Sequence, residues 1–486
     1  MQRREFLKKS GAALAVASTA RPDFAEQGPE RLNLLFITVD DMNYSLPGFM
    51  GGKYHLTPCL DALAARSHRF INNRTTAPIC QPSREAMMTG LVPQHSGALG
   101  FNPVNEGTPT LTTVLKSRNY YTAAIHKLEH MQPASSFPWD STVGGGSRNP
   151  LEYADAVSQA IAQARSLKRP FFINCNINDP HRPFYGSPQA AEEDHHDTGS
   201  YQVARELRAE DVEVPSFLEN LPLVRKEFAQ YCNSAQRTDV SIGKVLDALR
   251  ATPEAENTIV LFSADHGMPF PFSKATVYNN GTRTPVLLSW PRMGKPRVFE
   301  DLTSNIDMLP TLLDLLSISP PEGIDGRSWV PIMHGEKQKD REYVFTHVNT
   351  LSNRMAFPMR AIQNHRYSLM FSPWSDGKLS FKAESMSGLT YNAMAKAAET
   401  NAEIAARVKQ YIYGIPLAFY DLQADPDQRV NQINAAEYRD EITSMKHLLL
   451  AYMEKTADPQ LENFKALLAG GKPLVIQPPR RHTQPA

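Results

Sequence analysis

Residues 34–41 read Leu-Leu-Phe-Ile-Thr-Val-Asp-Asp, a short apolar run that ends abruptly in two carboxylates. A run of this length, with no polar residue alternating along it, is typical of a strand buried on both faces of a parallel sheet. Three further runs have the same form: residues 120–125 before His126-Lys127, residues 171–177 before Asp179-Pro-His181, and residues 258–262 before Asp265-His266. We therefore predict four parallel strands of one sheet.

Helical patterns lie between these runs. Thr57-Pro58 has the form of an N-cap followed by a first-turn proline, and residues 228–249 repeat apolar side chains along one helical face. Strands that alternate with helices predict an α/β fold, in which a large, mixed but mainly parallel sheet is sandwiched by helices. Ligands of such sheets bind at the carboxyl ends of the strands, so the four polar clusters are expected to converge on one site.

The pattern changes after about residue 340. Short alternating segments at residues 357–362, 367–371 and 417–422 predict an antiparallel sheet, and helical stretches are expected at residues 393–411 and 438–455. We assign residues 31–340 to a catalytic α/β domain and residues 341–471 to a smaller C-terminal α+β subdomain. Residues 472–486 are rich in Pro, Arg and Gln, which predicts a disordered tail.

The composition excludes several classes of protein. The chain has 486 residues, and its 51 Lys+Arg balance its 51 Asp+Glu, which argues against a nucleic-acid-binding scaffold. A hydrophobic content of 41% is too high for a disordered chain, and 4 scattered Cys do not suggest a disulfide framework. No segment reaches the roughly 20 uncharged apolar residues that a membrane-spanning helix needs.

The first 20 residues have the features of an export signal. Arg3-Arg4 is followed by Phe6-Leu-Lys8, a mildly apolar run at residues 11–20 and the small residues Ser18-Thr-Ala20. This resembles a twin-arginine signal peptide, although an ordinary basic first helix is the alternative. The resemblance implies that residues 1–20 are removed, that the twin-arginine translocase is a partner, and that the protein is periplasmic or secreted and not membrane-bound after export.

Two acidic pairs at strand ends are candidate metal ligands. Asp40-Asp41 and Asp265-His266 offer carboxylate oxygens, which Ca²⁺ and Mg²⁺ prefer as ligands. Each pair taken alone could equally be a helix cap, because carboxylates are common at that position. A third segment, which begins at Cys80, removes this ambiguity.

Residues 80–90 read Cys-Gln-Pro-Ser-Arg-Glu-Ala-Met-Met-Thr-Gly, and we expect Cys80 to lie in a Pro-rich polar loop. The segment matches the Cys-x-Pro-Ser-Arg…Thr-Gly signature, by which the chain resembles the formylglycine-dependent sulfatases of the alkaline phosphatase superfamily. The resemblance implies an alkaline phosphatase-like fold and a maturase that converts Cys80 to formylglycine, whose hydrate attacks the sulfur of a sulfate ester. A reduced Cys80 that merely packs beneath a loop is the alternative.

The resemblance extends over essentially the whole mature chain and implies a role for several further polar residues. Arg84 would stabilise the hydrated aldehyde, Lys127 and Lys274 would bind sulfate, His130 would lie near the diol, and His181 would serve the leaving group. One Ca²⁺, or Mg²⁺, would be held by Asp40, Asp41, the modified Cys80, Asp265 and His266. The chain departs from the family at three positions: His126 replaces a glycine, His130 lies one place further from the lysine than is common, and His266 replaces a common Asn.

Among the sulfatases, residues 90–97, 179–182, 265–273 and 357–363 resemble the heparan N-sulfatase (sulfamidase) branch. That likeness implies a sulfated saccharide of the heparan or glycosaminoglycan kind as substrate, with N-sulfate and O-sulfate both open. Candidates for recognising a uronate or a further sulfate, each equally open to a structural role, are Arg182, His95, Arg354 and Arg360. Two other functions stay open: a phosphonate or phosphate monoester hydrolase of the same superfamily, and a catalytically inactive exported carbohydrate-binding protein.

Overall fold

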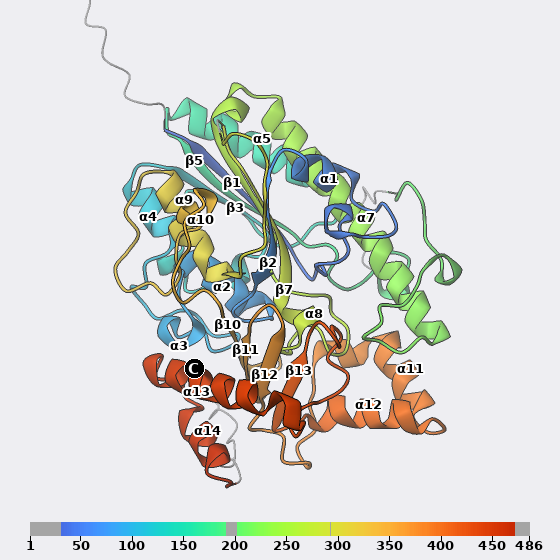
Figure 1. The fold of residues 1–486 in the computed structure, drawn as a ribbon. Coiled ribbons are helices and arrows are strands. Elements are labelled where there is room, and N and C mark those ends of the chain that lie inside the picture. The colour runs from blue at the N-terminus through green and yellow to red at the C-terminus, as the bar shows by residue number, and fades with distance from the viewer. Residues whose placement is uncertain (1–30, 191–201, 292, 472–486) are drawn as a thin grey trace, which may run out of the picture. The chain divides into compact units, whose positions relative to one another are not determined.

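The computed structural model describes residues 31–190, 202–291 and 293–471, which form two sheets with their helices (Figure 1). The predicted signal peptide and the predicted C-terminal tail lie outside the described residues. The strands of the first sheet are β1 Asn33–Val39, β2 His68–Arg74, β3 Tyr121–Ile125, β4 Ser141–Val143, β5 Phe171–Ile177, β6 Thr258–Ala264, β7 Arg283–Ser289, β8 Val298–Phe299 and β9 Thr303–Ser304.

The first sheet is mixed and mainly parallel, as predicted. Its strand order is β4-β3-β5-β1-β6-β7-β2-β8, and β9 also pairs with β2. The four predicted strands are β1, β3, β5 and β6, and they are neighbours that pair in parallel. Only β7 runs antiparallel to its two neighbours, β6 and β2. The carboxyl ends of the four predicted strands therefore meet at one edge of the sheet.

Helices cover both faces of this sheet. They are α1 Pro58–Ala64, α2 Cys80–Thr89, α3 Pro93–Ser96, α4 Leu111–Ser117, α5 Pro150–Ser166, α7 Pro222–Arg250, α8 Asn279–Thr282, α9 Met308–Leu315 and α10 Val330–Met333. Alternate residues of β1 enter different cores: Leu35 and Ile37 pack with α1, α5 and α7, whereas Leu34 and Phe36 pack with α2, α4, α9 and α10. This burial on both faces explains why β1 is apolar from Leu34 to Ile37 and again at Val39.

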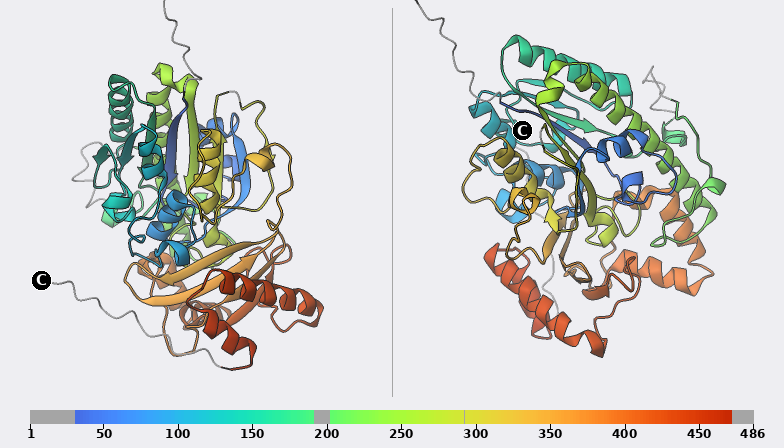
Figure 2. Two further views of the ribbon diagram at one scale, coloured as in Figure 1. Left: turned by 90° about the vertical axis from the view of Figure 1, so that its left-hand side faces the viewer. Right: turned by 45° about the horizontal axis from the view of Figure 1, so that its top comes forward.

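The second sheet is antiparallel and follows in the chain. Its order is β10 Val344–Thr350, β11 Ala356–Gln363, β12 Tyr367–Phe371 and β13 Leu417–Asp421. Helices α13 Arg439–Lys455 and α14 Leu461–Leu468 cover one face, and α11 Leu389–Ala397 and α12 Ala402–Tyr413 pack toward the core shared with the first sheet. Figure 2 shows this sheet beside the end of the first sheet that carries α2 and α8.

Two local predictions are wrong. Cys80 does not lie in a loop but begins α2, because Pro82 falls in the first turn, where a missing N–H breaks no intrahelical hydrogen bond. The predicted helix over residues 393–411 is interrupted. The side chain of Asn401 accepts hydrogen bonds from the backbone N–H groups of Glu403 and Ile404 and so starts a new helix, α12. None of the described helices is long and apolar enough to cross a membrane.

Candidate active site

The carboxyl ends of the four parallel strands bring their polar residues together. The backbone N–H of Asp40 donates to Ile177 O at 3.2 Å and that of Asp265 donates to Val39 O at 3.1 Å, so the hydrogen bonds between strands continue just past the strand ends. Asp41 then turns the chain with φ 69°, and its N–H donates to Asp265 Oδ1 at 3.1 Å. The turn directs the carboxylates of both strand ends to the same place.

Cys80 lies against these carboxylates at the first residue of α2. Its Sγ is 3.5 Å from Asp40 Oδ1 and 3.3 Å from His266 Nε2. Burial raises the pKa of the Cys80 thiol well above its usual value, and Asp40 adds to this effect. An unmodified Cys80 is therefore a poor nucleophile in this environment, since the thiolate form is disfavoured.

The same residues fit a divalent cation. One ligand atom from each of Asp40, Asp41, Cys80 and His266 lies within 4.8 Å of the other three, and all four residues are buried. Burial raises the pKa of Asp41 well above its usual range, and the neighbouring carboxylates raise it further. Oδ2 of Asp40 and Oδ1 of Asp41 each face the ammonium group of a lysine, Lys127 and Lys274 respectively. Crowded buried carboxylate oxygens of this kind suit Ca²⁺ or Mg²⁺.

Arg84 lies one turn of α2 beyond Cys80 and connects the helix to the sheet. Its Nη1 donates to Thr38 Oγ1 and to Asn176 Oδ1, both at 2.8 Å, and its Nη2 is 3.1 Å from Asp265 Oδ2. The sequence did not indicate that Thr38 and Asn176 belong to the site, although both lie within predicted strands. A planar guanidinium held at three points fixes the orientation of α2 over the strand ends.

Two lysines flank the cluster. Lys127 Nζ is 2.5 Å from Asp40 Oδ2, and Lys274 Nζ is 3.0 Å from both carboxylate oxygens of Asp41. Burial alone would lower the pKa of each lysine, but the facing carboxylate raises it, so both side chains are ammonium ions. Both His126 and Lys127 have positive φ, near 58° and 54°, so the position where the family resemblance implies a glycine has a backbone conformation that glycine adopts without strain.

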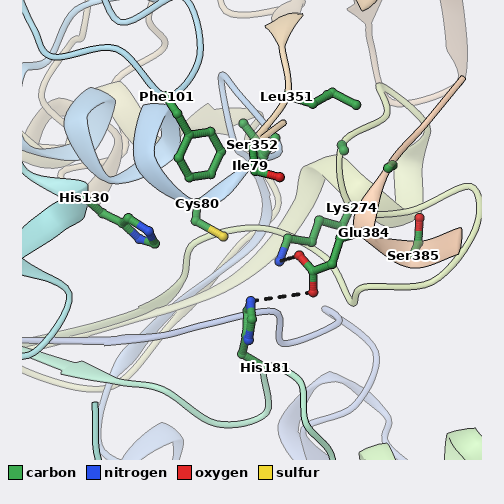
Figure 3. Close-up of a pocket in the computed structure, with 12 residues that line it drawn as sticks. Ile79, Cys80, Phe101, His130, His181, Lys274, Leu351, Ser352, Glu384 and Ser385 are labelled. Atoms are coloured by element: carbon green, nitrogen blue, oxygen red, sulfur yellow. Dashed lines mark ion pairs between the residues drawn. The ribbon is translucent and has the colours of Figure 1, made fainter. Parts of the chain in front are cut away.

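Two histidines lie on opposite sides of Cys80 (Figure 3). Burial, with Lys127 next, lowers the pKa of His130 to about 2, and burial and Lys274 lower that of His181 to about 4. Both imidazoles are therefore neutral at pH 7. Nδ1 of His181 is 2.6 Å from Arg182 O, so this nitrogen carries the proton and Nε2 is free to exchange a proton with a ligand.

Sequence reasoning missed one charged residue of the pocket, Glu384, which follows the second sheet's third strand. Its Oε2 is 2.9 Å from Lys274 Nζ, and its Oε1 is 3.6 Å from His181 Nε2. Asp41, His181 and Glu384 have the spacing of metal ligands, but the ammonium of Lys274 lies within contact distance of both carboxylates. Lys274 therefore supplies the positive charge there, and these three residues do not argue for a second cation.

Three of the four candidates for recognising an anionic sugar group are engaged elsewhere. Arg360 is buried and donates to Asp458, Arg182 donates to Glu227 and to Pro269 O, and His95 pairs with Asp325. These contacts favour the structural role for each. The fourth candidate, Arg354, is exposed.

The residues implied as catalytic or metal-binding line one pocket or the cluster beneath it. The pocket has a volume of about 140 Å³ and is lined by Ile79, Cys80, Phe101, His130, His181, Lys274, Ala275, Leu351, Ser352, Ala383, Glu384 and Ser385. Its lining combines strand-end residues of the first sheet with residues 351–352 and 383–385. The roles of the individual residues stay predictions.

Comparisons with known proteins agree with this geometry. A family model described as Sulfatase matches residues 32–318, and one described as N-sulphoglucosamine sulphohydrolase, C-terminal, matches residues 265–376. The chain is similar to the human N-sulphoglucosamine sulphohydrolase, with 29% identity over 373 residues, 70% of this chain and 72% of the human protein.

Solved structures show the same fold. A 2-O GAG sulfatase has a TM-score of 0.65 at 19% identity, with 94% of this chain and 100% of that chain covered. A protein solved in complex with its substrate D-glucosamine-2-N,6-O-disulfate has a TM-score of 0.65 at 17% identity, covering 89% of this chain and 99% of that chain. The mixed sheet, its helices and the second antiparallel sheet therefore form the alkaline phosphatase-like fold that the sequence predicts.

Proposed function

This chain belongs to the sulfatase family, and we propose that it hydrolyses a sulfate ester or N-sulfate on a sulfated, glycosaminoglycan-like sugar. The observation that carries the proposal is the position of Cys80. Its Sγ contacts Asp40 and His266 of the cluster on one side and lines the pocket on the other. A nucleophile formed at this residue would face both a bound cation and an incoming substrate.

We propose that Cys80 is oxidised to formylglycine, which supplies a hydrated aldehyde as nucleophile, and that the adjacent cluster binds one Ca²⁺. The donor set supports a hard cation, because three carboxylates, those of Asp40, Asp41 and Asp265, are completely buried there. Mg²⁺ is the alternative, and the imidazole of His266 is a less typical ligand for either ion. A cation at this place would offset the negative charge of a bound sulfate.

Different residues of the chain would then bind the sulfate and transfer protons. Lys127 and Lys274 bind the sulfate oxygens as ammonium ions, and Arg84 holds α2 in place. His130 is neutral at pH 7 and can accept a proton from the group formed at residue 80 when sulfate is released. On the opposite side of Cys80, the leaving amine or alcohol must gain a proton. Lys274 carries a proton at pH 7 and can supply it, and the neutral His181 beside it can assist the transfer.

The likeness to N-sulphoglucosamine sulphohydrolase over 70% of the chain supports a sulfated amino sugar as substrate. The pocket of about 140 Å³ beside Cys80 is the place where the sulfated group of such a sugar would enter. The test is the release of sulfate from N-sulfated and O-sulfated glucosamine, measured beside phosphate release from a matched phosphate monoester. Faster turnover of the phosphate ester would instead support the phosphomonoesterase alternative.

The state of residue 80 tests the proposed chemistry directly. Mass spectrometry of the peptide that contains it should show formylglycine in active protein. Cys80 with an intact thiol in protein that still releases sulfate would refute the proposed nucleophile. An intact thiol in inactive protein would instead support a carbohydrate-binding protein without catalysis.

We further propose that the protein is exported by the twin-arginine translocase after a cytoplasmic maturase has modified Cys80. Cys80 is 3% exposed in the folded chain, so an enzyme can reach it only before folding, and twin-arginine export carries folded proteins. An Arg3→Lys/Arg4→Lys variant should stay in the cytoplasm with formylglycine at residue 80. A thiol in this retained precursor, with formylglycine only in exported protein, would refute the order.

A further inference from the structure

Glu384 gives the leaving-group side of the pocket a negative charge. Its carboxylate contacts Lys274 through Oε2, and Oε1 lies 3.6 Å from His181 Nε2, too far for a hydrogen bond. Lys274 lowers the pKa of Glu384 to about 2, against the opposing effect of burial, so the side chain is ionised. Figure 3 shows Glu384, Lys274 and His181 together, on the side of Cys80 away from His130.

One oxygen of this carboxylate has no donor. Oε1 of Glu384 is buried and accepts no hydrogen bond from the described residues. A buried carboxylate oxygen without a donor carries a large desolvation cost, which a hydrogen bond from a ligand would remove. Because Glu384 also lines the pocket, the missing donor can come from a substrate.

The position of Glu384 is fixed by its surroundings. Glu227 of α7 accepts hydrogen bonds from Leu389 N at 2.9 Å and Thr390 N at 2.7 Å, and from Arg182 Nη1 at 2.5 Å. The carboxylate of Glu227 thus connects the start of α11, which lies five residues after Glu384, to Arg182, which follows His181. Ser385 Oγ also hydrogen-bonds Tyr411 Oη at 2.6 Å. Glu384 is therefore held at the pocket from both sides.

We propose that Glu384 is a specificity-determining residue that accepts a hydrogen bond from an N–H or hydroxyl group beside the scissile sulfate and excludes sugars with a second anionic group there. The inference rests on the proposed sulfatase function and narrows its substrates. A sulfate or carboxylate next to Oε1 would meet a like charge at an oxygen that is itself buried, although the Glu384 side chain as a whole is 31% exposed. Arg182, which could have balanced such a group, is already engaged by Glu227.

The size of the effect follows from charge repulsion and from the unpaired oxygen. Juxtaposed like charges and unpaired polar groups change rate constants by more than about a hundredfold in fully buried sites, and the 31% exposure of the Glu384 side chain reduces the expected effect. The wild-type protein should therefore prefer a monosulfated glucosamine over its disulfated counterpart by at least about tenfold in kcat/KM. Glu384→Gln removes the charge but keeps the shape, so most of this preference should disappear.

The experiment compares kcat/KM of the matured full-length enzyme on matched monosulfated and disulfated glucosamines. Glu384→Gln should bring the ratio of the two values toward one, whereas Glu384→Asp keeps the charge and should retain the preference. Glu399→Gln is the matched control, because Glu399 is exposed in the turn after α11 and its side chain pairs only with Lys396 among the described residues. Its ratio should equal that of the wild type.

Two failures can be told apart. If the wild-type enzyme releases no sulfate from any of these sugars, the proposed function is wrong and the inference is overturned together with it. If the wild-type enzyme is active and Glu384→Gln changes both rate constants by the same factor, only the inference is overturned, because a merely structural role would lower both rates equally. Loss of the preference in Glu384→Asp as well as in Glu384→Gln would equally refute the argument from charge.

Discussion

Glu85 is a completely buried carboxyl group on α2, the helix that begins with Cys80, and replacing it with glutamine should stabilise the protein at neutral pH. Its Oε1 accepts hydrogen bonds from Gln81 Nε2 at 3.0 Å and from Gln132 N at 3.3 Å. Its Oε2 has no partner among the described residues. Burial raises the pKa of Glu85 from 4.5 to about 8, against the opposing effect of the two hydrogen bonds.

The sign of the pH dependence follows from the raised pKa. Below pH 4.5 both the folded and the unfolded chain hold the proton, so Glu85 costs no stability. Between pH 4.5 and 8 the unfolded chain releases the proton while the folded chain retains it, and the free energy of unfolding falls. The loss reaches about 3 kcal/mol at pH 7 and approaches about 5 kcal/mol above pH 8.

Glu85→Gln keeps the acceptor oxygen and resembles the protonated acid, so it removes this loss. The variant should match the wild type at pH 5 to within about 1 kcal/mol and exceed it by about 3 kcal/mol at pH 7. Urea unfolding of both proteins at pH 5, 7 and 8.5 measures the difference between their free energies of unfolding. The titration of all other groups contributes equally to both proteins and cancels in this difference. Glu399→Gln, at an exposed position, should show no such trend. A constant difference between Glu85→Gln and wild type across this pH range would refute the reasoning.

Three further predictions concern catalysis. Cys80→Ala should abolish sulfate release while leaving the unfolding midpoint near that of the wild type, and residual activity above a hundredth of the wild-type rate would contradict a nucleophile at this position. His130→Ala should accumulate sulfated enzyme, which mass spectrometry detects. His181→Ala should instead slow formation of the sulfated enzyme by about 10² to 10⁴-fold, and more with poor leaving groups. Loss of the same step in both variants would contradict separate roles for the two histidines. Chelation of divalent cations, or Asp265→Asn, should lower kcat by several orders of magnitude, and full activity of metal-free protein would speak against a catalytic cation.

Much of the fold could be predicted because buried parallel strands have a strong local signal. The strands β1, β3, β5 and β6 are mainly apolar and completely buried, and polar residues follow each of them, so their type and their shared edge follow from pattern alone. The beginning of α2 was not predicted, because a proline next to polar residues has the same appearance in a loop and in the first turn of a helix. The break before α12 depends on one capping residue, Asn401, which overrides a continuing helical pattern.

The candidate site was predicted where residues follow directly after a strand or belong to a compact motif. Asp40, Lys127 and Asp265 are of this kind, since the strand fixes where each side chain must lie. Glu384 and Glu85 are not. Glu384 reaches the pocket through packing of a segment far along the chain, and Glu85 is unusual only because its surroundings exclude water. Neither property has a signal in the sequence near the residue.

The two sides of the pocket consequently differ in origin. Three of the groups that would bind or react with sulfate are attached to the first sheet. Cys80 begins α2, the helix after β2, and Lys127 and His130 follow β3, so their positions depend on that sheet. The side that would meet the rest of the sugar is completed by Glu384, from a segment between β12 and α11, and Glu227 ties that segment to the first sheet's helices. Substitutions in such a connecting segment can change which sugar fits while leaving Cys80, Lys127 and His130 in place, and of the sulfate-binding groups only Lys274 contacts Glu384 directly. The signature around Cys80 therefore indicates the reaction, whereas the proposed substrate preference depends on Glu384 and its neighbours.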